Sequence, residues 1–461
     1  MSTLLVLWDD ASLWGLLVAR ALKAYGLPHR FVRGHEVQNG ILSRLDASLF
    51  MVPGGSAKAK AVSLGHKGSD AIRNFVREGG HYIGVCGGAG LALNWHNGDE
   101  IAGLGLCPWG RGAFDDRLQH FMSGHLHVSL ACGRQERTRE DACLAPQCPA
   151  EQRGEVCERE GTTQCKKLSE FGSSLLPPYS LGPEEEALLP VWWPGRFEQE
   201  ETPEVEVLAR YSGPGPDFWL TDLPISSLPP NTFEIWNNLY GISVTPTFLE
   251  GQPCVIRGDY GKGSYLISYS HLETPDSPFA NAWLAHLFRT LAGLEPVIDV
   301  TPPWDMAAEP VLWDDSDLAF VEECLAAVAA VGLEHGIFFQ RNEWLLGWRA
   351  GIPGANVNSL LATIRVIRRT VPCEESKVYW QTIREKIISA AEFFRQAGTE
   401  YLLSERLSQT LTKILPDTVP QYVLRDQRNA LFGPPMQAGG VFLSLLGPLD
   451  HLAFLQLRHQ G

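Results

Sequence analysis

Four short apolar runs near the amino terminus alternate with segments of helical spacing, and this alternation restricts the fold more than any other feature of the chain. Such runs are typical of buried parallel strands, and here they cover residues 4–8, 29–33, 48–52 and 82–85. Helices are expected over residues 11–25 and from Ser69 or Asp70 to Glu78, because apolar residues recur on one face and glycines follow. This order predicts a doubly wound parallel α/β sheet that binds ligands at the carboxyl ends of its strands.

The composition excludes several functional classes. The chain has 461 residues, enough for two or three domains of about 150 residues each. Asp and Glu outnumber Lys and Arg by 53 to 38, and the net charge of −15 argues against general binding to nucleic acid or anionic membranes. No apolar run approaches the ~20 residues of a membrane span, and the amino terminus lacks the basic region of a secretory signal. We therefore expect a cytoplasmic protein whose ten cysteines are thiols, with no nucleic-acid or membrane partner.

The middle of the chain is less regular. Strands are expected at 205–209, 254–257 and 264–268, the last two joined by a hairpin turn, and a helix at about 280–291. The stretch 132–167 is polar and carries five cysteines whose spacing fits no standard zinc site. We expect it to lie outside the main core as an excursion with incidental thiols. Metal binding by these cysteines and disulfide formation under oxidation are left as alternatives.

The carboxyl-terminal part has a different hydrophobic pattern. Its apolar residues recur at helical spacing, which predicts amphipathic helices over 318–331, 357–370, 374–396 and 400–415. The simplest interpretation is a helical domain, at about 300–461, in which these stripes form a core. A face that binds a protein partner is the alternative.

A cysteine lies in a glycine-rich turn between the fourth strand and a helix-compatible segment. The sequence is Gly84-Val85-Cys86-Gly87-Gly88. A nucleophile on such a turn is exposed, and its small neighbours allow the backbone to fold sharply. The amino terminus of the following helix also favours a thiolate. Cys86 is therefore a candidate nucleophile.

Two further motifs complete a possible catalytic set. His271-Leu272-Glu273 follows the strand at 264–268, and residues two apart in a strand point the same way, so Glu273 could orient the imidazole that serves the thiol. Pro53-Gly54-Gly55 ends the third strand, where its free amides could join that of Gly87 in holding an oxyanion. Each motif alone is also explained by an ordinary strand end or turn.

Together these pieces resemble the class I glutamine amidotransferase-like superfamily, in which a cysteine elbow acts with a distant His-x-Glu beside a glycine loop. The segment from Ile72 to Ala89 is most similar to the amidotransferase-like domain at the amino end of eukaryotic biotin–protein ligases. Pro53-Gly54-Gly55 and Gly68, which precede it, belong to the same resemblance. Gly261-Lys262-Gly263 before His271 also matches that branch. The resemblance covers roughly residues 1–295 and implies a flavodoxin-like Rossmannoid parallel sheet, elaborated by an insertion at about 110–250.

What this resemblance implies about function is a cysteine hydrolase or amidotransferase-like enzyme acting on a small amide-type substrate. Cys86, His271 and Glu273 would be catalytic, and Gly54, Gly55 and Gly87 would bind the oxyanion or substrate. A catalytically silent binding or scaffold module, with a helical partner-binding region, is the alternative. The chain lacks the glycine-arginine-glycine loop of a biotin ligase in the right place, so biotin ligation is not expected.

Other polar residues are weaker candidates. His125 and His127 share a strand face but form only half of a zinc site, and we expect neither metal nor cofactor. Asp9 and Asp10 follow the first strand, where one could contact a ligand, although a helix cap explains Asp10 equally well. The stretch 192–197 is interpreted as a hydrophobic plug rather than the rim of a cleft.

Overall fold

The computed structural model describes most of the chain, with short gaps and one long one. The described residues are 3–45, 47–97, 101–113, 121–131, 174–177, 187–200, 202–411, 414–415, 418–435 and 437–458. The cysteine-bearing stretch 132–167 lies outside these residues, so the expectation of a separate excursion there stays a prediction.

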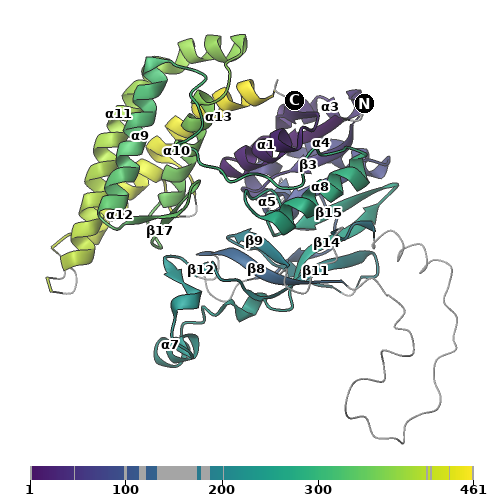
Figure 1. The fold of residues 1–461 in the computed structure, drawn as a ribbon, viewed down its shortest axis with the longest axis horizontal. Helices are drawn as coiled ribbons and strands as arrows, with labels where there is room; N and C mark the ends of the chain where they lie inside the picture. Colours follow the sequence, from purple (N-terminus) through teal and green to yellow (C-terminus); the bar gives the residue numbers. More distant parts are fainter. Residues whose placement is uncertain are drawn as a thin grey trace, which may run out of the picture.

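The amino-terminal part forms the parallel half of one large sheet (Figure 1). Its strands lie in the order β2-β1-β3-β4-β15, and every neighbouring pair is parallel. Their bounds are β1 Thr3–Leu7, β2 His29–Val32, β3 Ala47–Val52, β4 His81–Val85 and β15 Gly263–Ser268. This is the flavodoxin-like strand order, which reverses between β1 and β3. The carboxyl ends of those two strands therefore mark the expected ligand crevice.

Helices cover both faces of the parallel half because its strands are apolar on both sides. In β1, Leu4 and Val6 pack with α1 (Leu13–Tyr25) and α8 (Pro278–Ala292), whereas Leu5 and Leu7 pack with α4 (Ala57–Arg77) and α5 (Gly87–Ala92). All four strand residues are fully buried. The alternation follows from the period of two in a strand. Two short helices, α2 (Gly34–Gln38) and α3 (Ile41–Arg44), precede β3.

Helix α4 is longer than the sequence analysis expects. It begins after Ser56, whose hydroxyl accepts a hydrogen bond from the Ala59 N–H at 3.2 Å, rather than at Ser69 or Asp70. Gly65 adopts non-helical angles within it, so two shorter helices meet there at a kink. The first of these carries alanines but only two larger apolar residues, Val62 and Leu64, which is why the hydrophobic pattern misses it.

The middle of the chain adds an antiparallel half to the same sheet. The order continues from β15 as β14-β11-β8-β12-β13, with β9 beside β8. The bounds are β8 Met122–Leu130, β9 Leu188–Trp192, β11 Val205–Pro214, β12 Trp219–Leu220, β13 Leu223–Pro224 and β14 Pro253–Tyr260. The expected hairpin between β14 and β15 is confirmed, since Tyr260 pairs with Gly263 across the turn. The elaborated insertion therefore widens the sheet instead of covering it.

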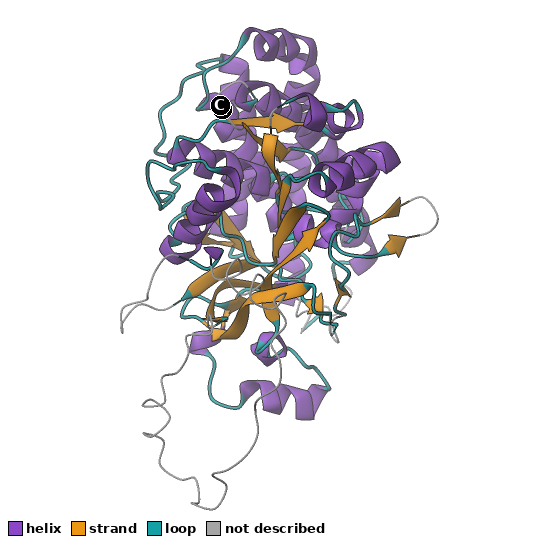
Figure 2. Cartoon of the chain, turned by 90° about the vertical axis from the view of Figure 1, so that its right-hand side faces the viewer, coloured by secondary structure: helices purple, strands orange, loops and turns teal. Residues whose placement is uncertain are grey.

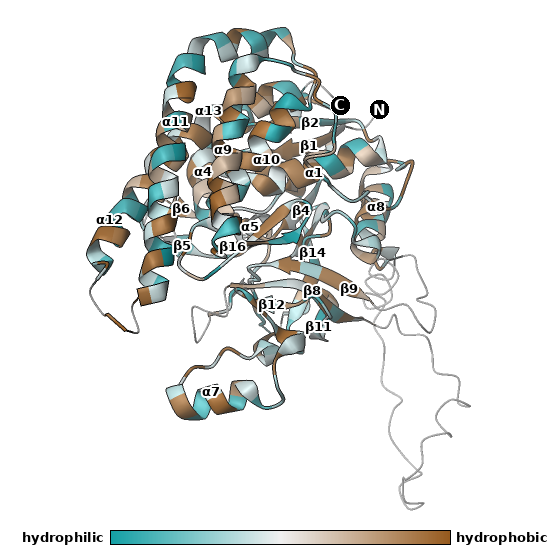
Figure 3. Cartoon of the chain, turned by 60° about the vertical axis from the view of Figure 1, so that its left-hand side comes forward, coloured by the Kyte–Doolittle hydropathy of each residue, from teal (hydrophilic) through white to brown (hydrophobic). Residues whose placement is uncertain are grey.

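Smaller elements lie around the large sheet. Two short pairs, β5 with β6 and β7 with β10, lie outside the main sheet. These elements, with two short 3₁₀ helices, are β5 His96–Asn97, β6 Ile101–Ala102, β7 Gly110–Arg111, β10 Phe197–Glu198, η3 Ile225–Ser227 and η4 Pro246–Leu249. Helix α7 (Thr232–Tyr240) buries none of its residues and stands away from the sheet (Figures 1 and 3).

The carboxyl-terminal part is mostly helical, as expected, and gathers at one end of the molecule (Figure 2). Its helices are α9 Ser316–Glu334, α10 Gly354–Arg368, α11 Glu374–Leu411, α12 Gln421–Phe432 and α13 Gly440–Leu457. The two helices expected over 374–396 and 400–415 are one continuous helix, α11. Gly398 does not break it, because this glycine is buried and faces Val328 of α9. The hairpin of β16 (Phe338–Asn342) and β17 (Leu345–Trp348) has no counterpart in the sequence analysis.

Helix α13 docks the carboxyl-terminal part onto the parallel half. Asp450 accepts hydrogen bonds from Trp8 Nε1 at 2.9 Å and from the Arg33 guanidinium at 2.9 Å. Arg33 also lies 4.5 Å over the ring of Phe454. One cluster of buried apolar side chains runs through both parts. The division into domains at about 1–295 and 300–461 stays a prediction.

Helix α13 is also the most apolar long helix. Among the described residues it alone has the length and composition to cross a membrane, and half of that 18-residue window is buried in the structure. A single half-buried helix is weak evidence for a membrane span.

Candidate active site

Cys86 occupies a strained turn between β4 and α5. Its φ of 50° and ψ of −103° are unfavourable for a residue with a side chain and cost on the order of 1–3 kcal/mol. The Cys86 N–H donates to the Ser268 carbonyl of β15 at 2.7 Å, which holds the turn against the sheet. The side chain is half-buried and the thiol is free. The predicted strand-to-helix elbow is confirmed.

The glycines around Cys86 are required by close backbone packing. A Cβ on Gly87 would lie 1.9 Å from the Gly55 carbonyl oxygen, and one on Gly88 would lie 2.0 Å from that of Val52. Gly55 itself has a φ of 113°, and a Cβ there would lie 1.9 Å from the Asp10 carbonyl oxygen. The ends of β1, β3 and β4 thus meet at the cysteine turn.

The structure also brings the histidine motif to this place. A Cβ on Gly54 would lie 2.8 Å from Cε1 of His271, so the glycine loop touches the imidazole. His271 follows β15, and its N–H donates to the Pro190 carbonyl of β9 at 2.8 Å. Asn281 of α8 donates to the carbonyls of Leu272 and Thr274 at 2.8 and 2.9 Å, which fixes the loop that carries Glu273.

His271 and Glu273 form a fully buried pair. Nδ1 of His271 lies 2.8 Å from Oε1 of Glu273, and neither side chain is exposed. Burial opposes protonation of the ring, but the charge of Glu273, followed by the charge and hydrogen bonding of the Cys86 side chain, outweighs it. Together they raise the pKa of His271 to about 10. The buried carboxylate therefore favours the imidazolium form of the ring.

Two atoms of this pair have no partner of normal hydrogen-bond geometry. They are Nε2 of His271 and Oε2 of Glu273, and both are buried. The thiol of Cys86 acts on the His271 pKa although Nε2 makes no well-aligned bond to it. Nucleophile and base are often poorly aligned before a substrate binds and tighten in the complex.

Tryptophans form a wall beside the imidazole. The ring of Trp14, from α1, lies 4.4 Å from that of His271. Trp193 meets Trp14 edge-on at 5.7 Å and stacks on Trp348 of β17 at 5.1 Å. The carboxyl-terminal hairpin therefore contributes to the surroundings of the site. Trp14 and Trp348 stand in no sequence motif that indicates a site.

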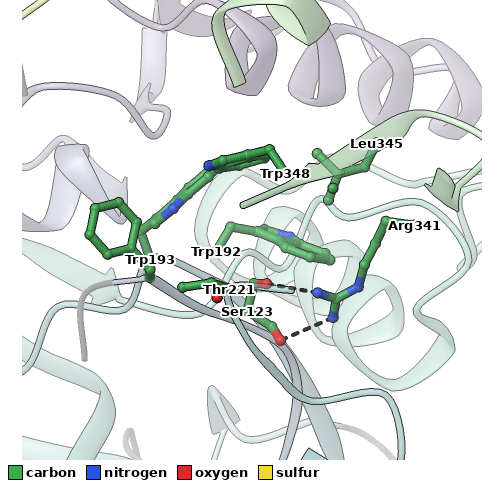
Figure 4. Close-up of a pocket in the computed structure, with 9 residues that line it drawn as sticks. Ser123, Trp192, Trp193, Thr221, Arg341, Leu345 and Trp348 are labelled. Atoms are coloured by element: carbon green, nitrogen blue, oxygen red, sulfur yellow. Dashed lines mark hydrogen bonds between the residues drawn. The ribbon is translucent and has the colours of Figure 1, made fainter. Parts of the chain in front are cut away.

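Trp193 and Trp348 of this wall also line a small pocket (Figure 4). Its volume is about 20 Å³, room for about one water molecule. Arg341 of β16 projects into it and donates to Ser123 Oγ at 2.9 Å and to the carbonyls of Ser123 and Asp217 at 3.0 and 2.6 Å. Burial lowers the pKa of Arg341 to about 10, so it stays charged at neutral pH. This arginine ties the hairpin to β8 rather than facing Cys86.

Several weaker candidates lie elsewhere or are structural. His125 is bonded to Asp217 at 2.9 Å and to Ser277 at 2.9 Å, and within the described ranges no group of three or more His, Cys, Asp or Glu side chains could hold a metal ion. Trp192 is buried, as expected of a plug, but Trp193 is half-exposed. The helix-cap interpretation of Asp10 is wrong, because Ser12 occupies the cap position of α1.

A comparison with known protein families matches the part of the chain that carries the glycine loop and the cysteine turn. Residues 44–97 match the family model described as biotin-protein ligase, N terminal. This segment includes the glycine loop and the cysteine turn but not His271 or Glu273. No curated protein matches the chain.

Two solved structures are similar at low identity. PurLQS from Thermotoga maritima is 11% identical, with a TM-score of 0.33, over 63% of this chain and 98% of that one. A beta-galactosidase from Rahnella sp. R3 is 14% identical, with a TM-score of 0.30, over 66% of this chain and 33% of that one. The chain therefore carries an α/β domain with a flavodoxin-like parallel sheet, and its segment 44–97 is similar to the N-terminal domain of biotin–protein ligases.

Proposed function

We propose that this protein is a cysteine hydrolase or amidotransferase-like enzyme that acts on a small amide-type substrate. The observation that carries the proposal is the buried His271–Glu273 pair, 2.8 Å apart, beside a cysteine in a strained turn. Strained backbone collects at functional sites, where the surrounding structure maintains it.

A purely structural role explains the pair poorly. Removing two ionisable groups from water costs several kcal/mol each, and buried pairs recover this only when their remaining atoms are also bonded. Here Nε2 of His271 and Oε2 of Glu273 have no partner of normal geometry. A base that must exchange a proton with the thiol and the substrate needs such a free nitrogen.

The proposed reaction proceeds in two stages through a thioester on Cys86. The sulfur of Cys86 attacks the amide carbonyl carbon, and the C–S bond forms as the carbonyl electron pair moves to oxygen. His271 gives a proton to the leaving nitrogen as the C–N bond breaks, which leaves a thioester and an amine or ammonia. Water, deprotonated by His271, then hydrolyses the thioester, or a second amine takes the acyl group.

The oxyanion would be held by backbone amides. Gly87 is the first residue of α5, so its N–H has no partner within the helix. Gly55 packs directly against Gly87, and its N–H is the second proposed donor. Removing one donor of this kind typically slows catalysis by about 10²–10³. Glu273 would hold the imidazole in the tautomer that places Nε2 toward the thiol.

A search for turnover tests the proposal. The full-length protein is incubated with a panel of small primary amides, and ammonia release is followed together with the intact mass of the protein. We expect ammonia release with at least one amide, and a thioester adduct on Cys86. Cys86→Ser and His271→Ala should abolish both, whereas Cys373→Ser, which removes another half-buried free thiol, should leave both unchanged.

The alternative is a catalytically silent binding or scaffold module whose helical part contacts a protein partner. The observation in its favour is the imperfect alignment of His271 Nε2 with the thiol. Absence of both ammonia and adduct across the panel, with binding of an amide retained in Cys86→Ser, would support this alternative instead.

A further inference from the structure

A lysine is buried beside the candidate nucleophile. Lys60, on the second turn of α4, is fully buried. Its Nζ donates to the main-chain oxygen of Asp9 at 2.7 Å, at the end of β1. The start of α4 packs against α5, because a Cβ on Gly90 would lie 3.3 Å from Cβ of Ala57. Lys60 therefore lies near both the segment that follows β1 and α5, the helix that follows Cys86.

The hydrogen bond of Lys60 does not require a charged side chain. Its hydrogen bond is to a carbonyl, which a neutral donor could satisfy as well. The Asp9 carboxylate is already bonded to the Arg33 guanidinium at 2.8 Å, to the Gly34 N–H and to the Ser63 hydroxyl. Fully buried lysines are rare unless they are paired, because the ammonium loses its hydration.

The charge acts on a group of anions that includes the nucleophile. Burial lowers the pKa of Lys60 to about 8, and the negative charges of Asp10, Asp9, Cys86 and Asp450 oppose this fall. Coupling between two titrating groups is reciprocal: if ionised Cys86 favours the ammonium, the ammonium favours ionised Cys86 by the same free energy. Lys60 is thus coupled by charge to the thiol as well as to the three carboxylates.

Lys60 also supports the strained end of β1. Asp10 has a φ of 53° and Ser12 a φ of 46°, so this loop is held in an unfavourable conformation. The Asp10 carbonyl packs against Gly55, and the Gly55 carbonyl packs against Gly87. The hydrogen bond from Lys60 to the Asp9 oxygen holds this loop in place. Through these contacts it also holds the two proposed oxyanion donors, Gly55 and Gly87.

We propose that Lys60 is a positioning residue for the candidate nucleophile: its buried ammonium stabilises the ionised form of Cys86 and fixes the end of β1 against the glycine loop. This inference rests on the proposed function, because it takes Cys86 as the nucleophile. It adds a fourth side chain, from α4, to the three that the motifs indicate.

The other titratable groups around the thiol are accounted for. His271 faces it from the loop after β15. The phenols of Tyr211 and Tyr269 are also coupled to it, but burial raises the pKa of both well above the usual value, so they stay neutral. Burial raises the pKa of Asp10, and the charge of Lys60 acts against this rise. Of the groups named here, Lys60 and His271 are the ones that carry a positive charge.

The test measures the pH profile of Cys86 alkylation by iodoacetamide, located by peptide mass spectrometry. Lys60→Gln keeps a donor for the Asp9 oxygen but removes the charge. We expect the midpoint of its profile to move up by about one pH unit, with an about tenfold slower reaction near neutral pH. Lys60→Arg, which retains the charge, should move the midpoint less. Lys58→Gln removes the same charge from an exposed site on the same helix and should leave the profile unchanged.

Comparing these variants with His271→Ala distinguishes a failure of this inference from a failure of the proposed function. If His271→Ala changes the profile and Lys60→Gln does not, the role of Lys60 is wrong and the proposed function stands. If neither variant changes it, both are wrong. A Lys60→Gln effect reproduced by Lys58→Gln would mean general surface electrostatics and would also overturn the inference.

A second measurement works even if Lys60→Gln fails to fold. The titration of Lys60 is followed by NMR in protein carrying ¹³Cε-lysine, with the signal assigned from Lys60→Arg, before and after Cys86 is capped with iodoacetamide. Capping removes the anion, so we expect the midpoint of Lys60 to fall. An unchanged midpoint would show that the two groups are not coupled.

Discussion

Replacing Glu273 by Gln tests the electrostatics of the site. The substitution keeps the size of the side chain and an oxygen that can accept from Nδ1 of His271, but it removes the charge. The charge of Glu273 is the largest cause that raises the pKa of His271 to about 10, and burial acts in the opposite direction. In Glu273→Gln we therefore expect the His271 pKa to fall, because burial then meets only the opposing effect of Cys86.

The sign of the effect on stability follows from linkage. A histidine whose pKa is raised in the folded state stabilises fully below its unfolded pKa of 6.5, and this contribution disappears as the pH rises through about 10. The whole shift corresponds to at most about 5 kcal/mol. Breaking buried pairs typically costs about 3–5 kcal/mol, so we expect a loss of about 3 kcal/mol at pH 6.5.

The assay is urea unfolding followed by tryptophan fluorescence at pH 6.5, 8 and 10. The difference in unfolding free energy between wild type and Glu273→Gln should shrink steadily across this series. Glu295→Gln, which removes an exposed carboxylate paired with Arg289, is the matched control and should change stability little at any pH. A difference that stays constant, or grows with pH, would refute the reasoning.

Three further substitutions test the packing around the site. Gly54→Ala should displace the His271 ring and reduce Cys86 reactivity at least tenfold, whereas Gly447→Ala, where a Cβ meets open space, should leave thiol alkylation unchanged. Trp193→Leu should open the aromatic wall, so that backbone amides next to Trp193 exchange hydrogen faster. The melting temperature should fall by a few degrees. Asp450→Asn weakens the contact with Arg33 and should cost about 1–3 kcal/mol, seen as a lower urea midpoint; no change would mean that α13 docks through apolar contacts alone.

The sequence predicts the parallel half of the fold well because both faces of these strands are buried. Uninterrupted apolar runs such as Leu4–Trp8 have few alternatives to a parallel strand. The sequence predicts the elbow at Cys86 equally well, because the glycines that allow close backbone packing stand next to it in the chain.

Other features depend on contacts that no local pattern contains. The continuity of α11 through Gly398 depends on packing against Val328, and the wall of Trp14, Trp193 and Trp348 joins three distant segments. Lys60 lies in a stretch of alternating Ala and Lys that reads as a solvated helix face, and only the tertiary fold buries it. The β16–β17 hairpin is short and lies between helices, where helical spacing dominates the pattern.

The central claim is that Cys86 and His271 act as a nucleophile and its base, and it can be tested without knowing the substrate. The rate of iodoacetamide alkylation at Cys86 is measured from pH 5 to pH 10 in wild type and in His271→Ala, with Cys373 as the internal reference thiol. The account predicts that Cys86 in wild type reacts near neutral pH at least about tenfold faster than in His271→Ala, while Cys373 is unaffected. Equal rates at Cys86 in the two proteins across this range would contradict it.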